Sequence, residues 1–303
     1  MSLRVVVTGG AGFVGSHVVE ALLARGHHVA VIDNLISGAR DNVDTRAVFY
    51  EIDIRDRSRL DRVIKSGFDA VVHLAAQTSV ARSWRDPMQD ARDNVLGTLS
   101  VLECCAAHQV DRLVFSSSAA VYGEPTELPV SEDAPLLPSS PYAVSKHSGE
   151  DYTRVFAREY GLRACILRFS NVYGPRQSSS GEAGVVAAFS RAMSAGRVVR
   201  VFGDGQQSRD FIFVKDVAAA VALAVESRVE GTMNISTNTS ATILELCALV
   251  ASVMSKNPVI DYGPSRPGDI RHSRLDNALA TVSLAWRPSV SLLEGIKKTV
   301  SGW

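Results

Sequence analysis

The N-terminal strand, turn and helix constrain the fold of this chain more than any other stretch. A short β-branched run over residues 3–8 leads into Gly9, Gly12 and Gly15, and a helical pattern over residues 13–25 ends at Gly26. Glycines at this GxxGxxG spacing permit a tight turn and a close approach of backbone to a pyrophosphate, whose charge the helix N-terminus stabilises. A Gly-rich turn alone is weak support for a ligand site. A turn placed between a strand and a helix, however, is the context that a dinucleotide-binding loop requires.

A second predicted strand over residues 28–32 is followed directly by Asp33. A carboxylate at this point accepts hydrogen bonds from an adenosine ribose and repels a 2′-phosphate, which favours NAD over NADP. The alternative role of Asp33 is a helix cap or a turn residue. Its spacing from the Gly-rich turn makes that interpretation the weaker one.

Strand and helix patterns alternate through the first half of the chain. Further strands are expected at residues 47–51, 70–74, 112–116 and 163–169, and helices at 55–65, at 87–108 and from Tyr142 to about residue 160. Repeated βαβ units predict an α/β fold of the Rossmann type, a doubly wound parallel sheet that binds ligands beyond the carboxyl ends of its strands.

The alternation loosens beyond residue 175. Short strands are expected at residues 198–202 and 211–214, the latter returning to the sheet, and helices at 216–226 and 242–255. We expect residues 1–174, with about 211–238, to form an NAD-binding Rossmann domain. Residues 175–210 and 239–303 are expected to form a smaller α/β lobe that binds the substrate.

The composition indicates a globular protein that recognises a small ligand. The 303 residues include 32 basic and 32 acidic side chains, so net charge gives no reason to expect nucleic acid or an anionic membrane as a partner. The four cysteines show no CxxC or metal-ligand spacing, which indicates reduced thiols and no metal. The N-terminus lacks a signal-peptide pattern and the longest apolar run, 217–225, is too short for a bilayer span, so we expect a cytoplasmic location.

Tyr142 and Lys146 lie one turn apart on the same face of their predicted helix. A neighbouring cation favours phenolate over phenol, so Lys146 is expected to bring the pKa of Tyr142 down from about 10 toward working pH. The alternative is a solvated pair on a helix surface. Whether the two residues form a catalytic base or a surface pair depends on whether the rest of the chain forms a cofactor site and a substrate site around them.

Ten segments together resemble the extended short-chain dehydrogenases/reductases, specifically the NAD-dependent nucleotide-sugar epimerase/dehydratase family. The segments are Thr8-Gly-Gly-Ala-Gly-Phe-Val-Gly15, Asp33-Asn-Leu-Ile-Ser-Gly38, Asp53-Ile54, His73-Leu-Ala-Ala76, Asn94-Val-Leu-Gly-Thr98, Phe115-Ser-Ser-Ser-Ala-Ala-Val-Tyr-Gly123, Tyr142-Ala-Val-Ser-Lys146, Arg168-Phe-Ser-Asn-Val-Tyr-Gly-Pro175, Ser208-Arg-Asp-Phe211 and Arg266-Pro-Gly-Asp269. Their order and spacing are specific, and the match covers nearly all of the chain.

The resemblance implies that NAD is the cofactor and assigns the residues around it. They are Gly9, Gly12, Phe13, Val14, Gly15, Asp33, Asn34, Leu35, Ser37, Gly38, Asp53, Ile54, Leu74, Ala75, Ala76, Gln77, Asn94, Ser116, Tyr142, Lys146 and Ser170. Phe13 and Val14 would present backbone to the pyrophosphate, and Lys146 would also bond the nicotinamide ribose. Thr78 departs from some bacterial UDP-galactose epimerases, which have a lysine there.

The same resemblance implies that Ser118, Tyr142 and Lys146 are catalytic. Tyrosinate would take the proton of the sugar 4-hydroxyl while hydride leaves C4 for the nicotinamide, with Ser118 bonded to the reacting oxygen. Return of hydride to the opposite face of the 4-keto sugar gives 4-epimerisation and leaves NAD bound. Ala119 and Ala120 stand where sugar 4,6-dehydratases usually have an Asp-Glu pair, so dehydration lacks its acid, and decarboxylating relatives tend to have a Glu at the first position.

The substrate implied is a UDP-hexose, UDP-glucose or UDP-galactose. The residues matched to substrate positions are Ser118, Tyr142, Asn171, Val185, Val201, Phe202, Arg209, Arg266, Asp269 and Ser273. Arg209 and Arg266 would pair with phosphate, Asp269 with the nucleoside ribose, and Val185 and Val201-Phe202 would flank the uracil. At the position of Ser273 the family tends to have a bulky aromatic if it handles only glucose and galactose, and a small residue if it also accepts a 2-acetamido group, so the N-acetylated sugars are also expected.

Three alternatives compete with this interpretation. One is UDP-glucuronate 4-epimerase, which Arg176-Gln-Ser178 disfavours because it lacks the extra arginine of those enzymes. Another is an NAD-dependent oxidoreductase that releases NADH, and the third is a non-enzymatic NAD-binding sensor or scaffold protein. The family also implies a homodimer formed by helices 87–108 and 142–160, where Val95, Leu99 and Leu102 form an apolar stripe that would equally serve internal packing.

Overall fold

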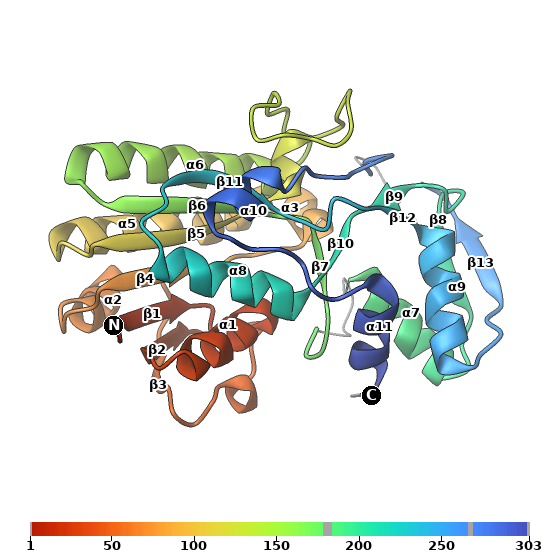
Figure 1. Ribbon diagram of the computed structural model, residues 1–303, viewed down its shortest axis with the longest axis horizontal. Helices are drawn as coiled ribbons and strands as arrows, with labels where there is room; N and C mark the ends of the chain where they lie inside the picture. The colour runs from red at the N-terminus through yellow and green to blue at the C-terminus, as the bar shows by residue number, and fades with distance from the viewer. Residues whose placement is uncertain (1, 178–183, 266–268, 302–303) are drawn as a thin grey trace.

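The computed structural model of the chain describes residues 2–177, 184–265 and 269–301. At its centre lies a parallel seven-stranded sheet with the order β11-β6-β5-β4-β1-β2-β3 (Figure 1). Its strands are β1 (Arg4–Thr8), β2 (His28–Asp33), β3 (Val48–Glu51), β4 (Ala70–His73), β5 (Arg112–Ser118), β6 (Arg163–Phe169) and β11 (Gly231–Ile235). The doubly wound Rossmann-type fold predicted from the alternating pattern is confirmed.

Helices cover both faces of the sheet because successive strand residues point to opposite sides. Val5 and Val7 pack in one core beneath α1 (Phe13–Ala24) and α8 (Val214–Glu226). Val6 packs in the other core with α2 (Arg57–Ile64), α5 (Gly97–Ala107) and the C-terminal part of α6 (Pro141–Tyr160). Figure 1 shows α1 and α8 together in front of the sheet. α10 (Ala278–Ser283) closes the same face beside β11.

The predicted helix over residues 87–108 contains a change of helical type. It runs as α4 (Pro87–Ala91), the π-helical segment η2 (Arg92–Leu96) and then α5. Asp86 caps α4 by accepting a hydrogen bond from Gln89 N (2.9 Å) and also ends α3 (Val80–Arg85), a helix that the sequence pattern did not predict. Asn94 is the buried residue of the π-helical segment η2, a type of turn that is frequent at functional sites.

Helix boundaries elsewhere follow their capping residues. Asp56 accepts from Arg59 N (3.1 Å), so α2 begins two residues later than predicted. Ser140 caps α6 and Pro141 occupies its first position, while Gly161, with φ of +67°, ends it where predicted.

A second group of elements packs around a separate core. These elements are α7 (Val185–Ser194), β8 (Val199–Phe202), β9 (Ser208–Arg209), β12 (Ala241–Thr242), α9 (Ile243–Met254), β13 (Ile260–Gly263) and α11 (Leu292–Val300). β8 pairs with β13 and β9 with β12, each as an isolated two-stranded ribbon. We refer to this group as the small lobe, which lies at the right of Figure 1.

The prediction that residues 211–214 return to the large sheet is wrong. β10 (Phe211–Phe213) is buried as expected, but it pairs in parallel with β7 (Asn171–Tyr173) in a separate ribbon. Phe211 and Phe213 pack in the small-lobe core, and this burial holds β10 away from the sheet edge. That edge is occupied by β11, which pairs with β6.

The carboxyl ends of β1 and β4 meet at the point where the strand order reverses. From β1 the chain proceeds outward to β2 and β3 and then returns to β4 on the other side of β1. Thr8 Oγ1 and His73 Nδ1 join the two strand ends through a 2.7 Å hydrogen bond. Such switch points are where open α/β sheets bind their ligands.

A buried ionic network joins α6 to the sheet. Arg168 on β6 donates to both carboxylate oxygens of Glu150 on α6 (2.8 and 2.7 Å), and Ser117 Oγ on β5 donates to Glu150 Oε1 (2.6 Å). Arg168 Nη1 also donates to Tyr122 OH (2.8 Å), which donates to Asn234 Oδ1 on β11 (2.7 Å). Burial raises the pKa of Glu150, but the bonds from Arg168 and Ser117 outweigh burial and leave that pKa below its usual range.

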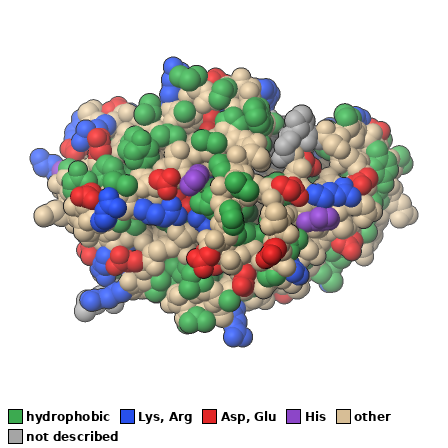
Figure 2. Space-filling view, turned by 90° about the horizontal axis from the view of Figure 1, so that it is seen from above, with side chains coloured by type: hydrophobic (Ala, Val, Ile, Leu, Met, Phe, Trp, Pro, Cys, Tyr) green, Lys and Arg blue, Asp and Glu red, His purple; other side chains and the backbone are tan. Residues whose placement is uncertain are grey.

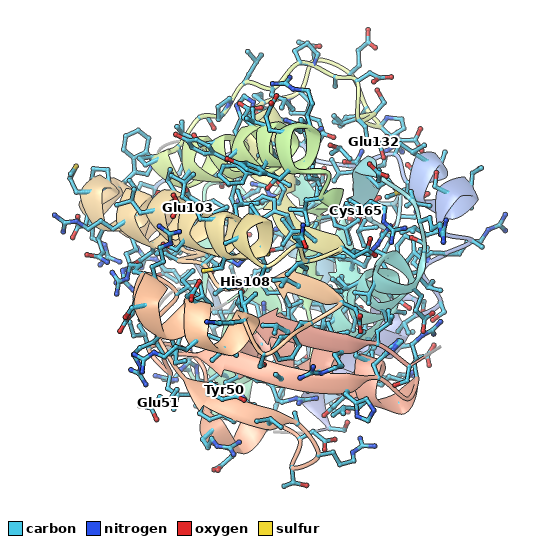
Figure 3. All side chains as sticks on the ribbon, turned by 90° about the vertical axis from the view of Figure 1, so that its left-hand side faces the viewer. Tyr50, Glu51, Glu103, His108, Glu132 and Cys165 are labelled. Carbon is cyan, nitrogen blue, oxygen red and sulfur yellow. The ribbon has the colours of Figure 1, made fainter. Side chains whose placement is uncertain are left out.

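Exposed ion pairs and mixed charges cover the outside. Arg57 pairs with Glu103 (3.0 Å) and Asp61 with His108 (2.7 Å), joining α2 to α5 and the residue after it, and both Glu103 and His108 are labelled in Figure 3. Figure 2 shows basic and acidic side chains interspersed on the face it views. The four cysteines are free and buried. Within the described ranges, no helix is both long and apolar enough to cross a membrane.

Replacing Glu150 by alanine should destabilise the fold strongly, because Arg168 would stay buried without its counter-charge. The expected loss in the free energy of unfolding is about 3–5 kcal/mol, measured by urea denaturation followed by circular dichroism. Glu159→Ala, which breaks the exposed pair with Arg158 at the end of the same helix, is the matched control and should change little. Equal effects of the two substitutions would contradict this account.

Candidate active site

The Gly-rich turn leaves no room for side chains at two of its glycines. A β-carbon at Gly15 would lie 2.0 Å from Gly9 O, and one at Gly9 would lie 2.7 Å from Ala75 N. Gly9 has φ of +72°, which an L side chain rarely adopts. Gly12 N donates to Gly9 O (3.1 Å), and α1 then begins at Phe13 with no acidic residue in its first turn. The turn therefore leaves exposed backbone and an unneutralised helix N-terminus, which together suit an anionic group.

Asp33 ends β2 beside this turn. Its carboxylate accepts hydrogen bonds from Ala11 N (3.0 Å) and Leu35 N (2.8 Å), so it ties the turn to the loop that follows β2. That loop, with Asn34, Leu35, Ser37 and Gly38, lies against the turn, since a β-carbon on Gly38 would be 2.9 Å from Ala11 C. Each carboxylate oxygen keeps a free lone pair for a hydroxyl group.

The loop after β3 adds a further predicted pair, Asp53 and Ile54. Asp53 accepts from Asn34 Nδ2 (2.9 Å), and hydrogen bonds from Arg55 hold the pKa of Asp53 well below its usual range. Ile54 is buried against Gly97. The residues predicted from three separate strand ends are thus neighbours in the structure.

The segment Leu74–Gln77 follows β4 on the other side of the turn and is fixed by Asn94. Asn94 Oδ1 accepts from Gln77 N (2.8 Å), and Asn94 Nδ2 donates to Gln77 O (3.0 Å) and to Ser145 Oγ (3.0 Å). The asparagine thereby connects the post-β4 segment with α6. Asn94 lies within the π-helical segment η2 and is its buried residue.

His73 ends β4 as a buried, uncharged residue whose ring connects β1 and α5 by hydrogen bonds. Thr98 Oγ1 donates to Asn94 O, so it accepts from His73 Nε2 (3.0 Å), and Nδ1 then accepts from Thr8 Oγ1. Burial, helped by the nearby charge of Lys146, lowers the pKa of His73 to about 3. This imidazole is therefore neutral at physiological pH.

Ser118, Tyr142 and Lys146 come together where β5 ends beneath α6. Ser118 is the last residue of β5, and its hydroxyl lies near enough to the Tyr142 phenol to favour the phenolate form. Lys146 is buried and donates to Ser116 O (2.8 Å), and its ammonium lies 5.3 Å from the centre of the Phe115 ring. Ser116 Oγ donates to His73 O (3.0 Å), which joins this group to the post-β4 segment.

The expectation that Lys146 lowers the pKa of Tyr142 is wrong for the free chain. Burial raises the pKa of Tyr142 to about 12, with a smaller contribution in the same direction from the charge of Asp90, while the Ser118 hydrogen bond opposes them. The Lys146 ammonium bonds the β5 backbone instead of the phenol. Desolvation, which the helical spacing of the two residues does not reveal, is the larger effect.

Several predicted substrate residues, together with Ser170 from the predicted cofactor set, lie around the β6–β7 and β9 segments. Ser170 and Asn171 follow β6, and Arg209 on β9 forms an ion pair with Asp269. Ser273 is buried and its backbone N donates to Ser208 O (3.1 Å), which places it next to Arg209 in the ribbon. The predicted phosphate and ribose ligands, Arg209 and Asp269, are thus in contact with each other.

Two other predicted substrate residues, Val201 and Val185, contribute to the small-lobe core. Val201 is 1% exposed, so only its backbone is available to a ligand, and Val185 is partly buried against the same core. Phe202, which ends β8, is partly exposed. Arg266 lies outside the described residues.

The structure adds groups that the sequence motifs did not single out. Asp90, four residues before Asn94, accepts hydrogen bonds from Gln77 Nε2 (2.7 Å) and Asn94 Nδ2 (3.2 Å). Asp210, next to Arg209, accepts from Ser170 Oγ (3.3 Å) and from Thr237 N and Oγ1 (2.9 and 2.8 Å), and burial raises its pKa to about 6. The helical spacing of Asp90 from Asn94 was the available signal for the first of these.

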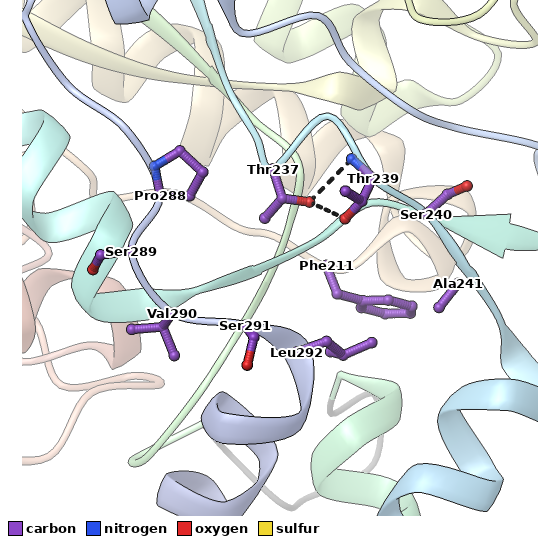
Figure 4. Close-up of a pocket in the computed structure, with 10 residues that line it drawn as sticks. All are labelled: Phe211, Thr237, Thr239, Ser240, Ala241, Pro288, Ser289, Val290, Ser291 and Leu292. Carbon is purple, nitrogen blue, oxygen red and sulfur yellow. Dashed lines mark hydrogen bonds between the residues drawn. The ribbon is translucent and has the colours of Figure 1, made fainter.

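A cavity of about 300 Å³ borders this group at Thr237, which also donates to Asp210. It is lined by Phe211 and by residues of the segments 237–241 and 288–292, and Figure 4 shows Thr237 bonded to Thr239 at its upper side. None of the predicted site residues lines it. It borders the junction between the large sheet and the small lobe.

Comparison with known proteins places this arrangement in a family. A model described as the NAD dependent epimerase/dehydratase family matches residues 5–236. The chain is similar to the crystal structure of UDP-glucose 4-epimerase with UDP-glucose from Thermotoga maritima, at 44% identity and a TM-score of 0.95, covering 99% of this chain and 98% of that chain. It is equally similar, with the same four values, to the crystal structure of UDP-glucose 4-epimerase from Thermus thermophilus in complex with NAD.

A third solved structure differs in the sugar. The UDP-N-acetylglucosamine 4-epimerase from Methanobrevibacter ruminantium M1, in complex with UDP-N-acetylmuramic acid, is 37% identical with a TM-score of 0.95. The similarity covers 99% of this chain and 98% of that chain.

Proposed function

The chain belongs to the NAD-dependent epimerase/dehydratase family, and we propose that it is an isomerase that inverts C4 of a UDP-hexose with NAD as its cofactor. The observation that carries the proposal is the convergence of Ser118, Tyr142 and Lys146 on one side of the switch point at which the Gly-rich turn lies. The similarity to solved UDP-glucose 4-epimerases supports the same activity.

The residues present fit NAD. The turn at Gly9 to Gly15 excludes side chains and offers backbone to a pyrophosphate, and Asp33 keeps acceptor capacity for the adenosine ribose. Asn94 fixes Gln77 on the side of the site assigned to nicotinamide. Lys146 would bond the ribose attached to nicotinamide. Bound NAD supplies the hydride acceptor and a positively charged ring, and a cation near the phenol favours phenolate.

The role of each residue in the reaction follows from the Ser118 hydroxyl at the end of β5 and the Tyr142 phenol on α6. Tyr142 takes the proton of the sugar 4-hydroxyl, and Ser118, whose hydroxyl lies near the same phenol, holds the reacting oxygen. Lys146 keeps its place on Ser116 O and provides positive charge below the phenol. Since the proton and the hydride both return to the sugar, the cycle is redox-neutral and releases no NADH.

Two alanines directly after Ser118 disfavour dehydration. Ala119 and Ala120 begin the short 3-10 helix η3 (Ala119–Tyr122), so the two residues that follow the catalytic serine offer no carboxylic acid to protonate a leaving hydroxyl. Elimination of water across C5 and C6 needs such an acid. The keto sugar therefore returns to the alcohol.

The sugar site admits both plain and N-acetylated hexoses. Ser273 has a small side chain and lies beside the Arg209 ribbon, where we expect a 2-acetamido group to be accepted. The similarity to a UDP-N-acetylglucosamine 4-epimerase supports this breadth. Arg209 and Asp269 hold the UDP part, exchanging their mutual ion pair for contacts with phosphate and ribose.

The two functions divide between two parts of the chain. Residues 1–174 with about 211–238 form the NAD-binding domain, and residues 175–210 and 239–303 form the nucleotide-sugar lobe. β10 belongs to the first by its pairing with β7 and to the second by the burial of Phe211 and Phe213, so it serves as the junction.

A second copy of the chain covers the outer side of η2 and α6 in this proposal. Leu96, Val144 and Val155 are 54%, 50% and 44% exposed and form an apolar face there, beside a groove of about 520 Å³. Leu102, which the sequence placed in the interface stripe, is fully buried in the core below the sheet and takes no part. The enzyme is a homodimer through this face.

Tyr142→Phe should abolish turnover while NAD stays bound, because only the proton acceptor is lost. We expect the epimerisation rate to fall by at least about a hundredfold, measured in a coupled assay, with NAD content determined after heat release. Tyr160→Phe, at the exposed end of the same helix, is the control and should keep full activity. Unchanged turnover in Tyr142→Phe would refute the mechanism.

A panel of UDP-sugars read by proton NMR at the anomeric position tests the substrate. UDP-glucose and UDP-galactose should interconvert without added NAD, and the UDP-N-acetylhexosamines should interconvert as well. Ser273→Tyr should remove the second activity by more than about tenfold and spare the first, because the ring fills the acetamido space. Stoichiometric NADH production, or activity on UDP-glucuronate alone, would contradict the proposal.

Val144→Glu should weaken the dimer by placing a charge in the apolar face. Light scattering after size exclusion should show the wild type at twice the chain mass, and the variant should shift toward the monomer on dilution. Val282→Glu on α10, a site that is 81% exposed on another face, is the matched control. A monomeric wild type would exclude the dimer.

A further inference from the structure

Lys146 is a buried cation whose counter-charge no motif identifies. Its ammonium donates to Ser116 O (2.8 Å) and lies near the Phe115 ring, but it forms no ion pair with any residue that the structure describes. A buried ammonium without a nearby negative charge is costly, and it tends to lose its proton. Some group in the surrounding elements must therefore supply the charge.

Four titratable groups surround Lys146. His73 on β4 and Tyr142 on α6 are both neutral near pH 7, because burial lowers the pKa of the first to about 3 and raises that of the second to about 12. Glu150, one turn further along α6, is occupied by Arg168 at both oxygens and by Arg154 (2.6 Å). The remaining group is Asp90 on α4, which packs against α6.

Asp90 is a buried acidic residue that likewise forms no ion pair with a described residue. It is 2% exposed, and its partners in hydrogen bonding, Gln77 and Asn94, are neutral amides. Over the ranges 2–177, 184–265 and 269–301 it forms no ion pair. Asn94 also bonds Ser145, the residue before Lys146, so one amide connects the carboxylate to the helix that carries the ammonium.

We propose that Asp90 is the counter-charge of Lys146 and a positioning residue for the reaction. Its carboxylate holds Gln77 and Asn94 in place on the cofactor side and at the same time keeps the buried Lys146 protonated. The pairing of the two charges is independent of turnover, whereas the positioning role rests on the proposed epimerase function.

The electrostatics of the site agree with the geometry. Burial lowers the pKa of Lys146 to about 8, and the charge of Asp90, followed by that of Glu150, opposes the fall. The same Asp90 charge raises the pKa of Tyr142. Removing it should therefore move both ionisations to lower pH.

Titration of the lysine side chains by NMR tests the charge pairing directly. The chain has six lysines, so protein labelled with carbon-13 at the lysine ε position gives a small set of signals, and Lys146→Met assigns the buried one. We expect a wild-type midpoint of about 8 for Lys146, against about 10.4 for exposed lysines. In Asp90→Asn the midpoint should fall by about one pH unit.

Two variants serve as controls for this experiment. Asp90→Glu keeps the charge and should restore a midpoint near that of the wild type. Asp93→Asn removes a neighbouring carboxylate that pairs with Arg55 (2.9 Å) and should leave the Lys146 midpoint unchanged. A midpoint in Asp90→Asn equal to that of the wild type would overturn the proposal, and so would a wild-type midpoint far below 7, even if Asp90→Asn failed to fold.

The pH profile of kcat tests the role in the reaction. In Asp90→Asn the profile should move to lower pH while KM for the UDP-sugar stays within about twofold, because Asp90 lies on the cofactor side. A uniform loss of kcat at every pH, with unmoved midpoints, would show a merely structural role and overturn the positioning claim. A wild type without epimerase activity would refute the proposed function and leave the lysine titration as an intact test of the pairing.

Discussion

The ion pair between Glu150 and Arg168 is the interaction on which the rest of the site depends. It joins the middle of α6 to β6, and through Ser117 and Tyr122 it reaches β5 and β11 as well. Tyr142 and Lys146 lie on α6 on the N-terminal side of Glu150, and Ser118 lies next to Ser117. The distance between phenol, hydroxyl and ammonium is therefore set by a buried polar network and not by the helix alone. Such a network rigidifies a site when all its members are satisfied.

Burial sets the resting ionisation of the site. In the free chain the pKa of Tyr142 is higher than that of an exposed tyrosine, and the pKa of Lys146 is lower than that of an exposed lysine. The site thus rests with a neutral phenol and a lysine whose pKa is about 8. A bound cationic ring changes the balance toward phenolate, so proton abstraction is coupled to the presence of the cofactor. This coupling protects an empty site from carrying an unpaired phenolate in its interior.

Local pattern accounts for a large share of the fold and of the cofactor side of the site. The turn at Gly9 to Gly15, the carboxylate of Asp33 and the alternation of strands and helices are all encoded within short windows, and they were predictable for that reason. The position of β10 was not, because it depends on Phe211 and Phe213 entering a core assembled from distant segments. The direction of the Tyr142 pKa was missed for a similar reason. Desolvation and the charge of Asp90 come from elements distant in the sequence, whereas the spacing of Tyr142 and Lys146 showed only their shared face.

The interleaved path of the chain limits how this architecture can be modified. The small-lobe core draws on residues from Tyr173 to Ile296, yet between them in sequence α8 packs on the large sheet and β11 is one of its strands. No single cut in the polypeptide separates the two parts, and neither can be transplanted as one contiguous fragment. A change of sugar specificity is therefore expected to come from individual replacements around the small-lobe ribbons. Exchanging one contiguous segment for that of another protein would not replace the small lobe as a unit.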